Sequence, residues 1–598
     1  MTRTTTSQES NVAPPAPEPE KVTQSKQDDP DEHHIPHNNL PLVFLALMLT
    51  AFLDALDQSI FTTALPTIVA QLGGGSAYSW VGSAYLIGAA AATPVCGKLS
   101  DIFSRKNILF PCIVIFLVGS ALCGAAQSMT WLVIARAIQG IGGGGTQVMV
   151  SVVIGDIFSL KDRGKYGSWI GAMWGIAGVL GPVIGGASSD RPSLMALGLL
   201  DQPVSLFQPI IYMLTGHRPT GGVAGLMLLF FLNLNPHEGR SLREHMQQFD
   251  FGGLVLFVGG VVSLLLGFSN SQNGWNRAST IVPLVIGFAA IVAGIFFEAW
   301  TSRSPLIPPR LFRTRTTAII FVTVFLHSFC FFCAPYYLPL YFQILGASST
   351  KSGVLLIPLS LLSSATSSVG GIIVSIMGDY RPVLWVGFGI MAIGYGLMIM
   401  LDEKSSLWVL FVCALQLVYS SIAGIGFGFP FVPPLIGMQA AMPERDMATS
   451  TSTFGLFRIL GSTVGIAIGQ TVWSSVSRRQ LAKISGLPLD LVGAGLADSV
   501  KEIQSIEPDS LREQVRHAYT SGVSAIWIMD TPIIVVCFVA VFFLKKYSLS
   551  RKVVRTGGNG APEVIPEGDN SSDVEKQAEV DAPEGKDEAQ VRQNVLSV

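Results

Sequence analysis

The sequence is a long series of apolar segments separated by short polar connections. Apolar runs recur between residues 39 and 544, and charged residues gather between them and at the two ends of the chain. A membrane-spanning helix needs about 20 apolar residues. At about 36 residues per helix and loop, this region holds about 14 spans. The pattern therefore predicts an all-α membrane protein with about 14 transmembrane helices.

The composition excludes several other classes of protein. Only 13% of the residues are charged, against about a quarter in soluble domains. A net charge of −2 provides no basic surface for nucleic acid. The chain lacks the Gly-rich loop that cradles ATP phosphates. It also lacks a nucleophile–base pair or a cluster of metal ligands at membrane depth. We therefore expect no enzyme activity, no catalytic residues, no metal, no cofactor and no use of ATP.

The placement of Lys and Arg predicts the topology. Alternate short loops are rich in these residues, as positive-inside loops are, and the loops between them carry few. Both termini are thus expected in the cytoplasm, with an even number of spans. Residues 1–38 and 545–598 are polar and are predicted to be disordered tails. No cleaved signal peptide is predicted, so the first span is expected to direct insertion.

One short loop carries a recognisable motif. Residues 97–106 read GKLSDIFSRK, between the second and third spans. This string resembles the G-x-L-a-D-r-x-G-r-[KR] signature of the major facilitator superfamily, with Ser104 in place of the second Gly. The resemblance implies a charge latch that closes the cytoplasmic gate. Its members here are Gly97, Asp101, Arg105 and Lys106. The alternative is that the basic pair serves only as a topology anchor.

Further strings follow in the order of one branch of that superfamily. Residues 56–66 resemble the first-span motif of fourteen-span drug:proton antiporters, and residues 136–142 match the R-x-x-Q-G-x-G motif of proton coupling. Residues 171–186 match the antiporter motif around G-P-x-x-G-G, and residues 457–461 are similar to the branch's C-terminal pattern. The resemblance implies two six-helix bundles with two extra central spans, of the kind found in fungal toxin and multidrug efflux proteins.

Charged residues inside spans are costly and usually functional. Asp54 and Asp57 lie three residues apart in the first span, on one helical face. Arg136 and Gln139 lie in the fourth span. We predict that Asp57 responds to protons, with Arg136 as its cationic partner and Gln139 beside them. The alternative is a fixed structural ion pair. Asp54 is expected at the lip of the cavity or in helix packing.

Glycine spacing in the fifth span predicts a helix that packs closely and bends. Small residues at intervals of three and four let helices approach, and a proline permits a bend. Tight packing without motion is the alternative. Gly142–Gly145, in the fourth span, are also expected to permit close helix contact. The residues of the antiporter helix are Gly175, Gly178, Gly181, Pro182, Gly185 and Gly186.

The second half of the chain is less diagnostic. Five polar residues are expected either to line a substrate cavity or to form hydrogen bonds between helices. Asp54 shares the first expectation. Glu298 and Asp530 are expected near headgroups. Cys330 and Cys333 are expected to be small apolar side chains, not a metal site, because no second ligand pair accompanies them. The five residues are His327, Tyr336, Tyr337, Gln343 and Gln416.

Residues 191–219 interrupt the resemblance. The family shows W-R-W-x-F-x-I-N-x-P at the entry to the sixth span, and this motif is absent here. Reading the codons from Met195 one nucleotide later permits Trp-Arg-Trp and the following residues in order. We therefore hypothesise a frameshift or a mis-spliced exon across this segment, with a genuine loop insertion as the alternative. Sequencing the spliced transcript tests this, because a message that codes the stretch in frame would exclude the artefact.

The resemblance implies a proton-coupled exporter of amphipathic organic compounds, by analogy a fungal toxin, another secondary metabolite or a drug. The alternatives are a proton-coupled importer of a small nutrient or chelate, and a membrane sensor that transports nothing. We expect a monomer in the cell membrane, or else in a vacuolar or vesicle membrane. The predicted parts are the tail 1–38, a six-helix bundle 39–236, two linking spans 237–316, a second six-helix bundle 317–544 with an extracytoplasmic loop 477–520, and the tail 545–598.

Overall fold

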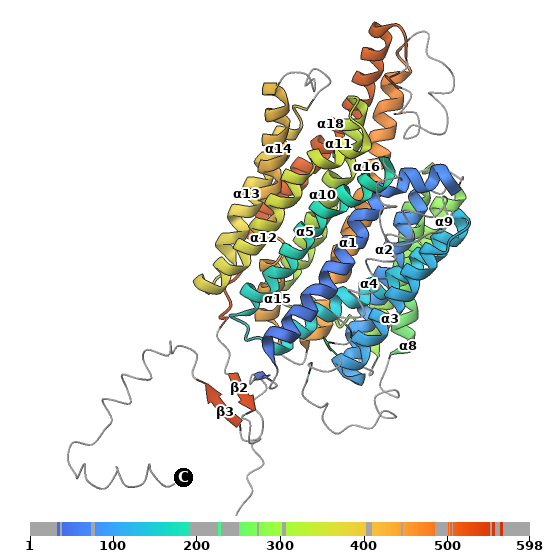
Figure 1. Cartoon of the computed structure of the whole chain (residues 1–598). Helices are drawn as coiled ribbons and strands as arrows, with labels where there is room; N and C mark the ends of the chain where they lie inside the picture. The colour runs from blue at the N-terminus through green and yellow to red at the C-terminus, as the bar shows by residue number, and fades with distance from the viewer. Residues whose placement is uncertain are drawn as a thin grey trace, which may run out of the picture.

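The computed structural model is a bundle of long helices that run side by side at moderate tilts (Figure 1). The first helix begins and the last long helix ends at the same end of this bundle, which we call the terminal end. The structure describes residues 33–35, 39–72, 78–190, 225, 227–228, 232, 250–271, 274–301, 307–401, 410–443, 446–484, 500, 503–504, 506–549, 553–556 and 562–565.

The first five helices form what we call the first bundle, and the strongest packing joins α4 to α2 and α3, and α1 to α5. Each helix coincides with an apolar run of the sequence. Ser128 caps the start of α4, where its side chain accepts a hydrogen bond from the Trp131 amide. The helices are α1 (Leu40–Leu72), α2 (Tyr78–Phe103), α3 (Arg105–Gly124), α4 (Met129–Ile157) and α5 (Arg163–Asp190).

The later helices form what we call the second bundle, whose core is one large cluster of buried aromatic and aliphatic side chains. Its helices are α10 (Arg315–Ile344), α11 (Ser349–Leu355), α12 (Ile357–Met377), α13 (Arg381–Met398), α14 (Leu410–Gly428), α15 (Pro433–Ala441), α16 (Met447–Leu481) and α18 (Asp509–Val541), preceded by the short 3-10 helix η3 (Pro309–Phe312). The two bundles meet mainly where α5 packs on α12 and where α2 packs on α16.

Two further helices, α8 (Phe251–Asn270) and α9 (Ala278–Trp300), pair with each other beside the bundles. Helix α8 contacts both α2 and α16, and Phe257, Val261 and Leu265 bury their side chains with residues of those helices. Helix α9 exposes most of its large apolar side chains, up to 87% at Trp300. This hairpin therefore covers the seam between the bundles on one side and presents an apolar outer face to lipid.

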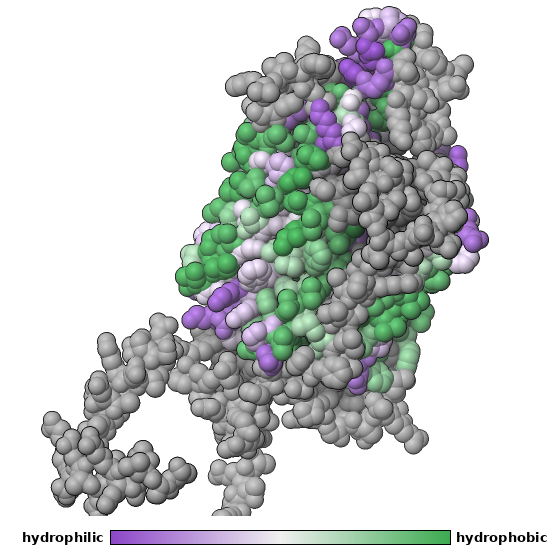
Figure 2. Space-filling view, in the orientation of Figure 1, coloured by the Kyte–Doolittle hydropathy of each residue, from purple (hydrophilic) through white to green (hydrophobic). Residues whose placement is uncertain are grey.

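Among the described residues, 12 helices are long and apolar enough to span a membrane. Helix α5, with 28 residues, is a further long helix that packs between α1 and α12. Most of the sixth predicted span and the whole of segment 191–219 lie outside the described residues. Figure 2 shows apolar side chains over the middle of the helices and hydrophilic ones toward the ends of the bundle. The expected all-α membrane fold with about 14 spans is thus confirmed.

Three short strands lie within the segments predicted as tails. Strand β1 (His33–Ile35) pairs in parallel with β2 (Val553–Thr556), and β2 pairs antiparallel with β3 (Pro562–Ile565). In register, His33 lies opposite Val553. The described parts of the two tails therefore lie side by side.

Glycine permits close helix contact inside the second bundle. A Cβ added at Gly394 on α13 would lie 2.5 Å from the Ala423 Cα atom of α14. Two residues later on the same helix, a Cβ added at Gly396 would meet nothing within 4 Å. Replacing each of these glycines with alanine therefore distinguishes the cost of steric crowding at Gly394 from the effect of helix propensity, which is common to both positions.

We expect Gly394→Ala to lower the midpoint of thermal unfolding, because overpacking a tight core costs about 1–3 kcal/mol. Gly396→Ala should leave the midpoint unchanged or raise it, because alanine favours a helix by up to about 1 kcal/mol over glycine. Thermal unfolding of the two purified variants in one detergent makes the comparison. Equal midpoints for both variants would contradict the close contact at Gly394.

Candidate functional site

The centre of the first bundle holds a closed network of three polar side chains from α1 and α4. The Arg136 Nη1 atom donates to the Asp57 Oδ2 atom and to the Gln139 Oε1 atom, each at 2.7 Å. The Gln139 Nε2 atom donates to the Asp57 Oδ1 atom at 2.8 Å. Because Arg136 and Gln139 lie three residues apart, both reach across to α1 from one face of α4. The structure thus brings together the three residues predicted for proton coupling.

This network is sealed from solvent. Asp57 and Gln139 are 0% exposed and Arg136 is 3% exposed. Removing one member of a buried ion pair leaves an uncompensated charge and costs about 3–5 kcal/mol. The arrangement therefore depends on the presence of both buried side chains, Asp57 and Arg136.

Tyr85 on α2 connects the network to a second carboxylate. The Arg136 guanidinium lies 4.6 Å from the centre of the Tyr85 ring, and the Tyr85 hydroxyl donates to Asp54. The Gln58 Nε2 atom also donates to Asp54, at 3.5 Å. Gly143 makes room for this arrangement, because an added Cβ there would overlap the Tyr85 hydroxyl. Asp54, Asp57 and Arg136 therefore belong to one connected group.

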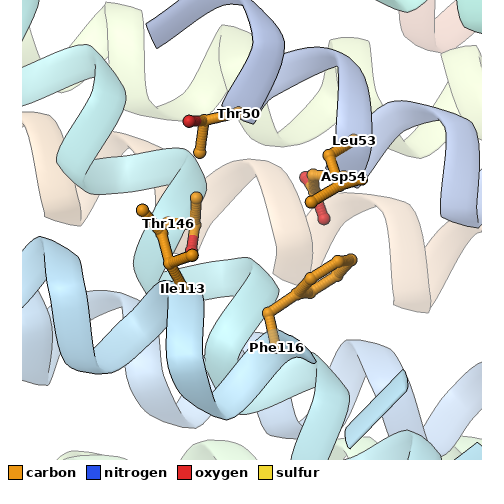
Figure 3. Close-up of a pocket in the computed structure, with 6 residues that line it drawn as sticks. All are labelled: Thr50, Leu53, Asp54, Ile113, Phe116 and Thr146. Atoms are coloured by element: carbon orange, nitrogen blue, oxygen red, sulfur yellow. The ribbon is translucent and has the colours of Figure 1, made fainter. Parts of the chain in front are cut away.

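Asp54 also borders a small pocket between α1, α3 and α4. In Figure 3 its carboxyl group lies beside the Phe116 ring, with Thr146 across the pocket. The pocket has a cavity volume of about 10 Å³, and its lining residues are Thr50, Leu53, Asp54, Ile113, Phe116 and Thr146. Asp54 is buried, which fits the expected packing role, and its carboxylate accepts a hydrogen bond from the Tyr85 hydroxyl.

A larger pocket lies between the two bundles, with a cavity volume of about 40 Å³. Five of its 13 described lining residues are aromatic, and Arg458 of α16 is the charged residue of that lining. The lining residues are Gln58, Tyr85, Leu86, Ala89, Gly144, Gln147, Trp174, Phe331, Phe332, Phe431, Arg458, Ile459 and Ser462.

The five polar residues proposed for the cavity in the second half lie elsewhere, since none of them lines this pocket. His327 bonds through Nε2 to the Phe427 carbonyl at 3.2 Å, and Tyr337 donates to the Ile466 carbonyl at 2.6 Å. Gln416 donates to the Tyr341 hydroxyl at 3.2 Å. These three contacts are interhelical hydrogen bonds, the second of the two expected roles.

The remaining two of the five occupy less central positions. Gln343 donates to the Ser352 hydroxyl at 3.3 Å, and Tyr336 is 36% exposed. Sequence reasoning did not select the aromatic lining, for example Trp174 and Phe431, because aromatic residues in spans also face lipid. The charge of Arg458, inside a motif already noted, was the one available signal.

The expectation for two acidic residues near headgroups was wrong. Asp530 is 0% exposed and Glu298 is 4% exposed. The Glu298 carboxylate accepts hydrogen bonds from the Ile307 amide at 3.1 and 3.2 Å. The Cys330 thiol donates to the Asp530 backbone carbonyl at 3.7 Å. Within the described residues, no group of three or more His, Cys, Asp or Glu is placed to hold a metal ion.

The predicted gate lies at the terminal end, where α2 and α3 meet. The Arg105 Nε atom donates to the Asp156 carboxylate of α4 at 3.0 Å, and the Lys106 Nζ atom donates to the Leu232 carbonyl at 3.0 Å. Asp156 was missed by the sequence reasoning. The side chain of Asp101 lies outside the described residues. The basic pair thus joins α3 to α4 and to the segment after α5.

Gly97 of the gate permits contact between the two bundles. A Cβ added there would overlap the Ser452 side chain of α16. Arg163, at the start of α5, reaches the same region, where it donates to the Gln439 amide oxygen at 3.4 Å and to the Met447 sulfur at 3.2 Å. The bundles are therefore held together at the terminal end by both small and polar residues.

The antiporter helix α5 packs through its glycines. A Cβ added at Gly175 would overlap the Ser364 side chain of α12, and one at Gly178 would lie 3.1 Å from the Ser360 Cβ atom. At Gly181 it would overlap Ser59 of α1. Helix α5 continues to Asp190, but the surroundings of Pro182, Gly185 and Gly186 lie outside the described residues. Its smooth face thus contacts both bundles.

These features coincide with a known family. The model of the Major Facilitator Superfamily matches residues 47–466. The chain belongs to the major facilitator superfamily. The predicted membership is confirmed, and the protein is a multi-pass membrane protein of a transporter family that carries small molecules.

Named relatives include efflux pumps. The chain is 35% identical to the efflux pump FUS6 of Gibberella moniliformis, over 90% of this chain and 93% of that protein. It is also 35% identical to the efflux pump dotC of Dothistroma septosporum, over 83% and 82%. An uncharacterized MFS-type transporter of Schizosaccharomyces pombe is 37% identical over 89% and 86%.

The fold is also that of a solved major facilitator structure. The crystal structure of the human organic anion transporter MFSD10 aligns with a TM-score of 0.54 and 15% identity. The alignment covers 84% of this chain and 100% of the human one. At this level of identity the likeness concerns the fold alone.

Ser104 departs from the superfamily motif, and its backbone shows why glycine is usual there. The residue precedes α3 with φ 82° and ψ 143°, and its side chain makes no capping hydrogen bond. This conformation is almost restricted to glycine and costs a side-chain-bearing residue about 1–3 kcal/mol. The gate of this protein therefore carries local backbone strain.

We expect Ser104→Gly to raise the midpoint of thermal unfolding, because it relieves about 1 kcal/mol of strain. The control is Ser128→Gly, which removes the cap of α4 at φ −149° and should lower stability by a few tenths of a kcal/mol. Both variants are compared by thermal unfolding of the purified protein. A lower midpoint for Ser104→Gly would contradict the assignment of strain.

Proposed function

We propose that this protein exports amphipathic organic compounds in exchange for protons. By analogy with its relatives, the substrate is a fungal toxin, another secondary metabolite or a drug. Two relatives that share most of its length are named efflux pumps, which supports the direction of transport. The apolar, aromatic wall of the pocket between the bundles suits an amphipathic molecule of that kind.

The observation that carries the proposal is the sealed network of Asp57, Arg136 and Gln139. When Asp57 binds a proton its carboxylate becomes neutral and loses its charge-assisted bond with Arg136. When Asp57 releases the proton, the ion pair forms again. Tyr85 contacts Arg136 with its ring face and also lines the large pocket. A change in the network therefore reaches the pocket wall through one side chain.

Alternating access requires the contacts between the bundles to form and break. In this structure the bundles touch at the terminal end through Gly97, Arg163 and Gly164. A Cβ atom added at Gly164 would lie 2.5 Å from the Gly371 carbonyl oxygen. We propose that this end faces the cytoplasm, so that these contacts close the cytoplasmic side. They separate when the pocket opens inward to load substrate. Arg105 and Lys106 steady the helix ends that move.

We further propose that the protein acts as a monomer in the cell membrane, with both termini in the cytoplasm. The basic short loops and the pairing of strands from the two tails support this orientation. A vacuolar or vesicle membrane is the alternative location. Protein fused to a fluorescent tag at either end, with protease accessibility of the tag in intact cells, tests both statements.

Asp57→Asn is expected to abolish substrate-driven proton movement, because asparagine cannot take up and release a proton. Proteoliposomes with a pH dye inside receive amphipathic compounds outside, with no imposed pH gradient. In the wild type, entry of an exported compound should drive protons out and make the lumen alkaline. In Asp57→Asn the signal should fall to that of protein-free vesicles. Asp509→Asn, which alters an 83% exposed carboxylate, is the matched control and should behave as wild type.

The same assay separates the alternatives. A proton-coupled importer would acidify the lumen when compound enters, because both move in one direction. A sensor that transports nothing would give no compound-dependent signal in any variant. Full coupled activity in Asp57→Asn would reject the role of Asp57, even if the protein proved to be an antiporter.

A further inference from the structure

Arg458 places one unpaired positive charge on the wall of the pocket between the bundles. It lies 11 residues into α16, about 17 Å along the helix axis at 1.5 Å per residue, and so near the middle of a bilayer core of about 30 Å. Within the described part of the chain, no acidic side chain forms an ion pair with it. A lone charge at this depth is costly and usually serves a function.

The contacts of Arg458 leave most of its hydrogen-bonding capacity unused. Its Nη2 atom donates to the Phe431 carbonyl at 2.7 Å, and the guanidinium lies 4.1 Å from the centre of the Phe431 ring and 5.0 Å from that of Phe454. The buried Nε atom has no hydrogen-bond partner in the described residues. A guanidinium carries five N–H donors in a planar fork. The two rings hold this fork in place while its other donors remain available.

The rest of the described pocket lining contains no group that neutralises this charge. The polar groups in its described lining are neutral, such as Gln58, Gln147 and Ser462, and Trp174 and Phe331 contribute apolar surface. The Asp57 charge is bound to Arg136, and Asp54 is bound by Tyr85 and Gln58 behind the wall. No counter-ion for Arg458 is present among the described residues, so an anionic molecule in the pocket would supply one.

We infer that Arg458 is a specificity-determining residue that selects organic acids, with a carboxylate on the guanidinium and an apolar body against the aromatic wall. A planar fork binds a carboxylate through two parallel hydrogen bonds. One cation in an otherwise neutral site favours a substrate with a single negative charge. The inference rests on the proposed transport function for the identity of the pocket, and it adds the class of substrate.

The test compares two probes that differ only in charge. Dansylglycine carries a carboxylate at pH 7.4, and dansylglycinamide is its neutral counterpart. Binding of each to the full chain in nanodiscs is measured by energy transfer from tryptophan, and Trp174 lies in the pocket wall. We expect the wild type to bind the acid at least about tenfold more tightly than the amide, because a charge-assisted hydrogen bond is worth this factor or more.

Arg458→Gln should remove this preference, with a loss of about tenfold or more in affinity for the acid and little change for the amide. Arg458→Lys retains the charge without the fork and should retain part of the preference. The control is Arg478→Gln, an exposed arginine near the end of the same helix, which should keep the wild-type ratio.

A role in folding alone would lower the affinity for both probes together and leave their ratio unchanged. An unchanged ratio in Arg458→Gln, or a wild type that does not prefer the acid, would overturn the inference. If Arg458→Gln does not fold, the wild-type ratio and Arg458→Lys still decide it. Binding is measured without a pH gradient, so a failure of proton exchange in vesicles would count against the proposed function and not against this inference.

Discussion

The ion pair between Asp57 and Arg136 is the constraint around which the first bundle is arranged. Two opposite charges inside a membrane are tolerated only if their geometry is good and their remaining groups are satisfied. Gln139 adds a hydrogen bond to each partner of the pair, and the Tyr85 ring covers the guanidinium. Glycines on α4 let α2 and α3 pack close enough to seal the site. Gly142 lies against Phe116 of α3, and Gly144 lies against Ala89 of α2. The polar centre thus requires the glycine-rich helix.

Much of the fold follows from the sequence because hydropathy and charge act locally. An apolar run of 20 residues forms a helix in lipid whatever surrounds it, since its backbone groups must be paired within the segment. The Asp57 network was predictable for a related reason, because few polar residues lie inside the spans of the first bundle. The burial of Asp530 was not predictable, because it depends on how α18 is rotated against its neighbours.

The gate and the pocket show the same limit. Arg105 and Lys106 were identified from one short loop, but the Asp156 partner lies 51 residues away on another helix. His327 seemed suited to a cavity because it is polar, yet buried polar groups pair with nearby backbone. Hydropathy cannot distinguish the aromatic side chains of the pocket wall from those that face lipid. Distances across helices, which no local pattern contains, decide these cases.

Two arginines at membrane depth have opposite surroundings, and the difference fits two tasks. Arg136 is ion-paired with Asp57, whereas Arg458 borders the pocket and has no acidic partner among the described residues. If an organic anion leaves while protons enter, both movements carry positive charge inward. A membrane potential that is negative inside then drives export together with the pH gradient, at about 2.3 kcal/mol per charge for each 100 mV. The unpaired charge of Arg458 would in this way determine the energy source of transport as well as its selectivity.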